Sequence, residues 1–238
     1  MRQSFRALLL AAGLGTRLRP ITLHTPKCLV PIAGEPLLGR WLRNLELAGC
    51  DSVLINTHYL ADEVDAFIRS WQSSTMSIQT TYEPELLGTA GTLLANQDFF
   101  ANSTGLLVHA DNAMQGDLTD LLSAHRRRHS FCQLTMLTFM TDTPSSCGIV
   151  EIDSQYVLQG FYEKVEQPPG NRANGALYAF DSDFLDYLNL LQPAPSDFSS
   201  EVIPQLVGRI QTYHTDQVYL DIGTPHSLEI AQQLLSQS

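Results

Sequence analysis

The feature that most constrains the fold is an alternation, through the first half of the chain, of short apolar runs with longer segments of helical periodicity. Short apolar runs predict buried strands, and leucines and alanines spaced three to four residues apart predict crossover helices, so the pattern indicates a wound α/β domain. The predicted strands are Ala7–Leu10, Ser52–Asn56, Ser77–Tyr82, Leu106–His109 and Gln133–Phe139. The predicted helices are Pro36–Ala48, Ala61–Trp71, Gly91–Gln97 and Leu118–Arg128.

From Cys147 onward the sequence pattern changes to an alternation of apolar and polar residues, which is typical of an antiparallel hairpin. The predicted elements there are strands at Gly148–Ile152, Val157–Tyr162 and Ala176–Phe180, helices at Phe184–Leu191 and Ser200–Val207, a strand at Val218–Leu220, and a helix from Pro225 capped by Thr224. We therefore expect a single domain over residues 1–238, with a mixed, mostly parallel sheet flanked by helices and a small antiparallel lobe.

Charge and cysteine usage exclude several classes of function. The 25 acidic and 14 basic side chains give a formal charge of −11, the wrong sign for a surface that binds nucleic acid. No apolar run approaches the roughly 20 residues that span a bilayer, so we expect no membrane partner. The four cysteines lack C-x-x-C spacing, which favours reduced thiols and a cytoplasmic location. The oligomeric state stays open, and a homo-oligomer is one of the states that the sequence allows.

A glycine-rich turn, Leu10-Ala-Ala-Gly-Leu-Gly-Thr-Arg-Leu-Arg-Pro20, follows the first strand directly. Ligands of wound sheets bind at this edge, where Gly13 and Gly15 permit close backbone approach to phosphates and Arg17 adds a forked donor. The turn is neither a dinucleotide fingerprint, since Leu18 stands where a small residue is needed, nor a P-loop, since Gly-Lys-Ser/Thr is absent. A plain tight turn is the alternative.

The continuation Pro26-Lys27-x-Leu-x-Pro31 makes the pattern specific. Together with the glycine-rich turn it resembles the signature of the sugar-1-phosphate nucleotidyltransferases, and the resemblance extends over nearly the whole chain. It implies that Arg17 and Lys27 are catalytic, the latter neutralising charge on the attacked phosphate, whereas the alternative for Lys27 is a surface lysine. The residues that it implies for nucleotide binding in this turn are Leu10, Ala11, Ala12, Gly13, Gly15, Thr16 and Arg17.

Two aspartates follow predicted strands far apart in the chain. Asp111 follows Leu106–His109, and Asp221 lies in Tyr219-Leu-Asp-Ile-Gly-Thr224. Mg²⁺ prefers a few carboxylates with phosphate oxygens and water, and the resemblance assigns both aspartates to that ion. Turn or helix-capping roles are the alternative. Ala110 stands where many relatives have glycine.

The same resemblance extends into the second half of the chain. It implies that residues 1–140 form a nucleotide-binding part and that residues 141–238 form the sugar-binding lobe with the closing strand and helix. It implies that Gly148, Glu163, Lys164 and Asn174 bind the sugar phosphate. An exposed ion pair is the alternative for Glu163 and Lys164. The chain departs from the family pattern at Val165, where a proline is common, and in the order Asn-Gly-Ala that begins at Asn174.

The prediction of which nucleotide base is bound depends on one segment, Tyr82-Glu-Pro-Glu-Leu-Leu-Gly-Thr-Ala-Gly91. This segment resembles the corresponding segment of guanylyltransferases that make activated mannose and heptose. The resemblance places Gly88 and Thr89 at the nucleotide, and Glu83 or Glu85 could accept hydrogen bonds from guanine, which favours GTP. The alternatives are a uridylyl- or thymidylyltransferase for glucose or amino-sugar 1-phosphates, a non-catalytic sugar-nucleotide sensor, and a glycosyltransferase using Asp181-x-Asp183. The basic cluster at residues 126–129 is expected to complement a helix dipole and face solvent.

Overall fold

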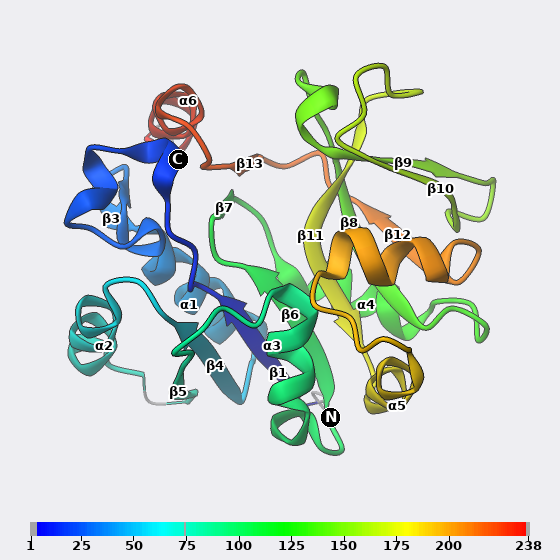
Figure 1. The fold of residues 1–238 in the computed structure, drawn as a ribbon, viewed down its shortest axis with the longest axis horizontal. Helices are drawn as coiled ribbons and strands as arrows, with labels where there is room; N and C mark the ends of the chain where they lie inside the picture. The colour runs from blue at the N-terminus through cyan, green and yellow to red at the C-terminus, as the bar shows by residue number, and fades with distance from the viewer. Residues whose placement is uncertain (1–3, 74, 237–238) are drawn as a thin grey trace. The chain divides into compact units, whose positions relative to one another are not determined.

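The computed structural model describes residues 4–73 and 75–236, and it divides into two compact units. The first unit comprises residues 1–86, 108–118 and 217–238, and the second comprises 87–107 and 119–216. Each unit is described by itself, with the elements labelled as in Figure 1. The expected division at residue 140 concerns function rather than packing, and it stays a prediction.

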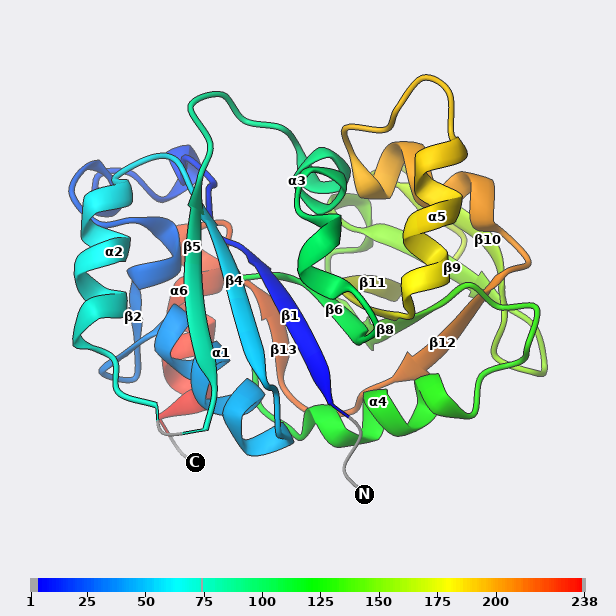
Figure 2. The same ribbon diagram turned by 90° about the horizontal axis from the view of Figure 1, so that it is seen from below.

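The first unit contains three parallel strands, β1 (Phe5–Leu10), β4 (Ser52–Thr57) and β5 (Ser77–Tyr82), which lie side by side in Figure 2. Helices α1 (Leu37–Ala48) and α2 (Ala61–Ser70) occupy the connections between them. Helix α1 buries Leu38, Trp41, Leu42 and Leu45, which the three-to-four spacing places on one face. This is the parallel arrangement that the alternating pattern predicts.

The first unit also contains three short strands that the sequence pattern did not predict, β2 (Pro31–Ile32), β3 (Glu35–Pro36) and β7 (Asn112–Met114). Strands β2 and β3 form a hairpin, and β7 pairs antiparallel with β13 (Tyr219–Asp221), which was predicted one residue earlier, at Val218–Leu220. Helix α6 (Pro225–Leu235) follows β13, and the Thr224 side chain caps it as expected, in a reciprocal pair with Ser227. The pairing of β7 with β13 matters for the site because both strands adjoin a predicted metal ligand.

The second unit is built largely from antiparallel strands. Strand β11 (Arg172–Phe180) pairs antiparallel with β8 (Leu134–Met140) and β9 (Gly148–Ile152), and β9 pairs antiparallel with β10 (Leu158–Glu163). Strand β12 (Ile210–His214), which the sequence pattern missed, pairs parallel with β8. The α-helices that lie wholly in this unit are α3 (Thr89–Ala95) and α5 (Ser182–Leu190). Strand β6 (Thr104–His109) and helix α4 (Leu118–Arg126) each cross one of its boundaries in the sequence.

One predicted helix of the second unit takes another form. Residues 200–207 form no α-helix, because a π-turn, Phe198–Val202, is followed by a 3₁₀ turn, Ile203–Leu206. Pro204 has no N–H and cannot make the backbone hydrogen bond that an α-helix needs there. The turns still bury Phe198, Val202 and Ile203, so they contribute to the core of the second unit.

The expected fold class is confirmed: a mixed sheet arrangement with flanking helices and a small antiparallel part. Among the described residues, no helix combines the length and the apolar character that crossing a membrane requires.

Candidate active site

The glycine-rich turn begins where β1 ends, and its two glycines serve different purposes. Gly15 has a φ of +61°, and a Cβ there would lie 2.9 Å from Thr22 Cγ2, so a side chain is strained and crowded. The Thr22 hydroxyl donates a 2.6 Å hydrogen bond to the Gly15 carbonyl and fixes the turn. At Gly13, by contrast, no atom lies within 4 Å of where a Cβ would be. Gly15 therefore shapes the loop, and Gly13 borders open space.

Lys27 occupies the start of a 3₁₀ turn, Lys27–Leu29, and its side chain is only 9% exposed. Its ammonium nitrogen, Nζ, lies 2.5 Å from Asp111 Oδ2 and 3.5 Å from Asp221 Oδ1. Arg17 Nη2 lies 3.9 Å from Asp221 Oδ2. The structure thus brings together the four side chains assigned to catalysis and metal binding, and it excludes the alternative of a solvated surface lysine.

The pairing of β7 with β13 explains how two aspartates distant in sequence meet. Asp221 lies opposite Asn112 in the register, and the Ile222 N–H donates to the Asp111 carbonyl at 2.9 Å. Trp41 of α1 anchors this pair, since its Nε1 donates to the Asn112 carbonyl at 2.8 Å. Backbone hydrogen bonds therefore hold both carboxylates in place.

Gly223, two residues after Asp221, keeps the site open. A Cβ at Gly223 would lie 2.6 Å from Asp221 Oδ2 and 2.8 Å from Arg17 Nη2. Such distances require a shift of one or both side chains. The sequence analysis assigned no role to this glycine, although it lies in the motif that supplies Asp221.

The two carboxylates have opposite pKa shifts. Burial raises the pKa of Asp111, but the charges of Lys27 and His109 and the Lys27 hydrogen bond outweigh it and hold that pKa below its usual value. Burial and the neighbouring charge of Asp111 raise the pKa of Asp221 above its usual value, against the smaller effects of Lys27 and Arg17. One lysine therefore does not fully neutralise the pair.

This donor set fits a magnesium ion. Mg²⁺ takes one or two protein carboxylates and fills its other positions with phosphate oxygens and water. Asp111 Oδ2 and Asp221 Oδ1 lie 2.5 Å and 3.5 Å from the same Lys27 nitrogen, so the two carboxylates converge on one position, as a shared cation requires. No group of three or more potential His, Cys, Asp or Glu ligands gathers among the described residues, so any ion here would depend on its substrate for further ligands.

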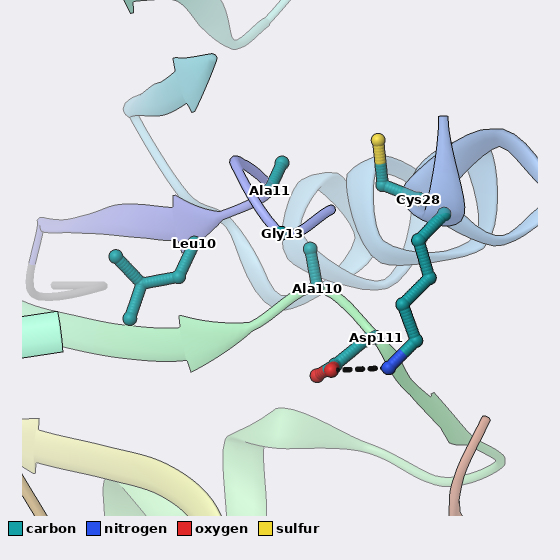
Figure 3. Close-up of a pocket in the computed structure, with 7 residues that line it drawn as sticks. Leu10, Ala11, Gly13, Cys28, Ala110 and Asp111 are labelled. Atoms are coloured by element: carbon teal, nitrogen blue, oxygen red, sulfur yellow. Dashed lines mark hydrogen bonds and ion pairs between the residues drawn. The ribbon is translucent and has the colours of Figure 1, made fainter. Parts of the chain in front are cut away.

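A small pocket lies at this end of β1. In Figure 3 a dashed line from the labelled Asp111 marks its ion pair with Lys27. The residues that line it are Leu10, Ala11, Gly13, Lys27, Cys28, Ala110 and Asp111. Burial raises the pKa of the Cys28 thiol to about 12, so this cysteine is protonated at neutral pH and is no nucleophile. The pocket joins the glycine-rich loop to the charged cluster.

The other residues assigned to the nucleotide lie in varied settings. Ala12 is buried, Thr16 begins a 3₁₀ turn, and the Glu83 side chain is buried rather than presented to solvent. In the second unit, a Cβ on Gly88 would lie 2.4 Å from the Ser196 carbonyl oxygen, and the Thr89 hydroxyl accepts a 2.7 Å bond from the Phe198 N–H. Gly88 and Thr89 therefore both lie against the backbone of residues 196–198. The role of these residues at the nucleotide stays a prediction.

Three of the four residues assigned to the sugar phosphate lie together in the second unit. Gly148 and Glu163 are opposite one another on β9 and β10, and a Cβ on Gly148 would lie 2.6 Å from Glu163 Oε2. Lys164 is 66% exposed, has a φ of +50°, and pairs with Glu163 at 3.1 Å. The Asn174 amide donates to the Tyr178 hydroxyl at 2.7 Å and accepts from the Ala176 N–H at 2.9 Å.

Asn56 is a polar residue at the site that the sequence analysis missed. Its side-chain oxygen accepts a 2.7 Å hydrogen bond from the Ala11 N–H, at the start of the glycine-rich loop. The sequence could have indicated Asn56, because it is a polar residue at the end of a largely apolar predicted strand, at the sheet edge where ligands bind.

Comparisons with known proteins show the family to which the chain belongs. Residues 6–238 match the nucleotidyl transferase family. A UTP–glucose-1-phosphate uridylyltransferase from Synechocystis is 30% identical over 234 residues, which cover 92% of this chain and 60% of that protein. A mannose-1-phosphate guanylyltransferase from Mycobacterium tuberculosis is 30% identical over 223 residues, with 92% and 61% covered. The chain spans about three fifths of the length of these curated relatives.

Solved structures show the same fold at lower sequence identity. A crystal structure from Bacillus anthracis, assigned as a glucose-1-phosphate thymidylyltransferase, has a TM-score of 0.88 at 23% identity and covers 98% of this chain and 96% of its own. HddC from Yersinia pseudotuberculosis has a TM-score of 0.80 at 23% identity, with 96% and 98% covered. The match over residues 6–238 identifies this chain as a member of the nucleotidyl transferase family.

Proposed function

We propose that this protein transfers a nucleotidyl group from a nucleoside triphosphate to a sugar 1-phosphate, giving a nucleotide sugar and pyrophosphate. The observation that carries the proposal is the convergence of Lys27 and Arg17 on Asp111 and Asp221 beside the open position at Gly13. Two cations suit phosphates, and two carboxylates suit a divalent ion that accompanies a triphosphate. Family membership and the names of the curated relatives support the same reaction class.

The chemistry is an in-line displacement. A phosphate oxygen of the sugar 1-phosphate attacks the α-phosphorus, a new P–O bond forms, and the bond to the bridging oxygen of pyrophosphate breaks. The attacking oxygen is already ionised at neutral pH, so no general base is needed. Catalysis then rests on positioning and on neutralising negative charge, which the Lys27 ammonium and the Arg17 guanidinium provide.

Asp111 and Asp221 would hold Mg²⁺ in this proposal. The ion would supply positive charge to the phosphate oxygens. In the structure, the Lys27 ammonium itself lies against both carboxylates. We propose that Lys27 exchanges these contacts for the attacked phosphate when substrates bind, since its four-carbon stem allows a compact charge to move.

The sugar 1-phosphate would be bound by residues of the second unit. Lys164 is exposed enough to meet a phosphate, and Glu163 is close enough to Lys164 to orient it. The glutamate can also accept hydrogen bonds from sugar hydroxyls. Gly148 leaves the space that a side chain would fill against Glu163, and Asn174 contributes an amide.

We propose GTP as the preferred triphosphate, and a uridylyl or thymidylyl transfer as the alternative. Glu85 is exposed after the end of β5 and can accept hydrogen bonds from the guanine amino and ring N–H groups. Relatives with 30% identity include both a guanylyltransferase and a uridylyltransferase, so the base has to be measured.

The setting of the reaction is also a proposal. We propose a cytoplasmic enzyme, and the support is that all four cysteines are free thiols. Small molecules are the expected partners, and a homo-oligomer stays a prediction.

A substrate grid tests the function. Four nucleoside triphosphates are each combined with mannose, glucose, heptose, glucosamine and N-acetylated amino-sugar 1-phosphates, with and without Mg²⁺, and pyrophosphate is measured. We expect Mg²⁺-dependent release that needs both substrates and is fastest with GTP. Binding without release across the grid would favour a sensor. Consumption of a nucleotide sugar without triphosphate would favour a glycosyltransferase.

A further inference from the structure

A line of buried polar groups leads from β5 through β4 to the start of the glycine-rich loop. Asn56, on β4, and Glu83, just after β5, are each only 4% exposed. Asn56 Oδ1 accepts a 2.7 Å hydrogen bond from the Ala11 N–H, and Asn56 Nδ2 donates a 3.0 Å hydrogen bond to Glu83 Oε1. The three groups therefore form one connected chain inside the first unit.

The chemistry of the three groups fixes the direction of this chain. The Ala11 N–H can only donate, so the Asn56 amide must turn its oxygen toward it. The amide nitrogen then faces Glu83, whose Oε1 accepts the hydrogen bond that the nitrogen donates. Glu83 is itself held, because its N–H donates to the Thr57 carbonyl at 2.9 Å and its carbonyl lies 2.8 Å from His58 Nδ1.

This chain of bonds acts at the point where backbone pairing stops. The register of β1 with β4 ends at Leu10 opposite Asn56, so Ala11 is the first residue beyond the paired strand. A buried backbone N–H without a partner is costly, and its partner decides where the backbone goes next. The Asn56 side chain supplies that partner two residues before Gly13.

We infer that Asn56 is a positioning residue for the proposed reaction, and that Glu83 works through it by fixing the orientation of the Asn56 amide. The inference rests on the proposed function for its kinetic consequence. It also assigns Glu83 to positioning the glycine-rich loop rather than to binding the nucleotide base, which leaves Glu85 as the carboxylate that can distinguish guanine. If Glu83 only positions the loop, changing it should affect all triphosphates equally. If Glu83 recognised the base, changing it would alter the preference between triphosphates.

A pair of exchanged side chains tests the inference by steady-state kinetics. In Asn56→Asp a carboxylate faces the Glu83 carboxylate, and we expect kcat/KM for the triphosphate to fall about tenfold or more, because misplaced binding loops lose rate steeply. In Asn56→Asp combined with Glu83→Gln, the glutamine amide can donate to the new aspartate, and we expect recovery to within about threefold of the wild type. Circular dichroism and the Tm check that each variant is folded.

Two kinetic outcomes would overturn the inference. One is a double variant no more active than Asn56→Asp, since the exchanged pair should restore the connection. The other is a Glu83→Gln variant that changes the preference between GTP and UTP, since that result would make Glu83 a base-reading residue. We expect Glu83→Gln to keep the wild-type preference, and the KM for the sugar 1-phosphate to stay within about twofold in all three variants.

A readout that does not require activity separates this inference from the proposed function. Amide hydrogen exchange at Ala11, followed by NMR, should be faster in Asn56→Ala and should return to the wild-type rate in the exchanged double variant. If the wild type releases no pyrophosphate with any substrate pair, the proposed function fails while the exchange result still tests the connection. Unchanged exchange at Ala11 in Asn56→Ala would overturn the connection whatever the activity.

Discussion

Two clusters of charged side chains among the described residues differ in their electrostatics. The site cluster, in the first unit, consists of Arg17, Lys27, Asp111 and Asp221. Burial opposes ionisation of both carboxylates, but Lys27 and His109 hold the pKa of Asp111 below its usual value, whereas burial and the charge of Asp111 raise the pKa of Asp221. The site cluster is therefore short of positive charge.

The structural cluster, in the second unit, consists of His125, Arg128 and Asp181. Arg128 Nη2 donates to Asp181 at 2.7 Å, and His125 Nε2 lies 3.5 Å from the same carboxylate. The Thr104 hydroxyl adds a 3.0 Å hydrogen bond. The contact with His125 and the bond from Arg128, opposed by burial, together hold the pKa of Asp181 well below its usual value.

The comparison separates a cluster that is complete from one that is not. Asp181 has its donors within the protein, which is typical of an ion pair that stabilises a fold. Asp221 lies 3.5 Å or more from both of its cations, and its raised pKa marks a place where a further cation would be favourable. Changing one residue in each cluster should therefore affect different properties.

The largest expected effect is on turnover at the site cluster. Lys27→Ala and Asp111→Ala should each reduce turnover at least about a hundredfold, because one electrostatic contact of this kind contributes about 3 kcal/mol to a transition state. Pyrophosphate release measures the loss, and an unchanged circular-dichroism spectrum shows that the fold is intact. Asp181→Asn is the matched control, expected to stay within about twofold of the wild type. Full activity in both alanine variants would remove the site cluster from the mechanism.

The second-largest expected effect is a loss of folding stability when the structural cluster is changed. Asp181→Asn should lower the free energy of unfolding by about 1–2 kcal/mol, because Arg128 and the Thr104 hydroxyl lose a charged acceptor. The Asp181 side chain is 43% exposed, so the loss should be smaller than for a fully buried pair. Urea denaturation measures it. If Asp221→Asn lowered the free energy of unfolding by as much as Asp181→Asn, the proposed difference between the two clusters would be wrong.

The stability difference between wild type and Asp181→Asn should depend on pH. The pKa of Asp181 is lowered in the folded state, so its contribution is fully present above the unfolded pKa of about 3.9 and is lost as the pH falls toward the folded value. Urea denaturation of both proteins between pH 7 and pH 3 should show the two free energies of unfolding approaching each other in acid. A difference that stays constant over this range would show that Asp181 acts through packing rather than charge.

The smallest effect is a shift in the pKa of one carboxyl. Asp111→Asn removes the negative charge that raises the pKa of Asp221 and frees Lys27 for it, so the pKa of Asp221 should fall. Carbon-13 NMR of the aspartate carboxyls follows this titration. Asp181 serves as the internal reference, because its partners are unchanged. An unchanged pKa of Asp221 in Asp111→Asn would mean that burial, and not the charge of Asp111, sets it.

The sequence predicted much of the fold because local patterns carry it. Strands β5 and β9 were predicted with the bounds observed, since β9 contains a short apolar run and β5 is rich in β-branched residues that favour strands. The strands β7 and β13 were missed or only approximately placed, because each has three residues, too few for an alternating pattern. The meeting of Asp111 with Asp221 depends on this pairing, so only the family resemblance could predict it.

Side-chain contacts between distant residues were the least predictable. The basic cluster 126–129 was expected to face solvent, and Arg126 and Arg127 do, but Arg128 turns onto Asp181. That expectation was wrong for Arg128, because helix-end reasoning cannot see a carboxylate 53 residues away. Asn56 and Glu83 were likewise missed as a pair, since their contact depends on the parallel register of β4 with β5.

In the proposed function, a divalent ion and a triphosphate complete the site cluster. Titration with Mn²⁺, followed by electron paramagnetic resonance with and without GTP, tests it most directly. We predict one bound Mn²⁺ per chain in the wild type and in Asp181→Asn, tighter with GTP, and no such site in Asp111→Asn combined with Asp221→Asn. Equal Mn²⁺ binding in the wild type and that double variant would contradict the account.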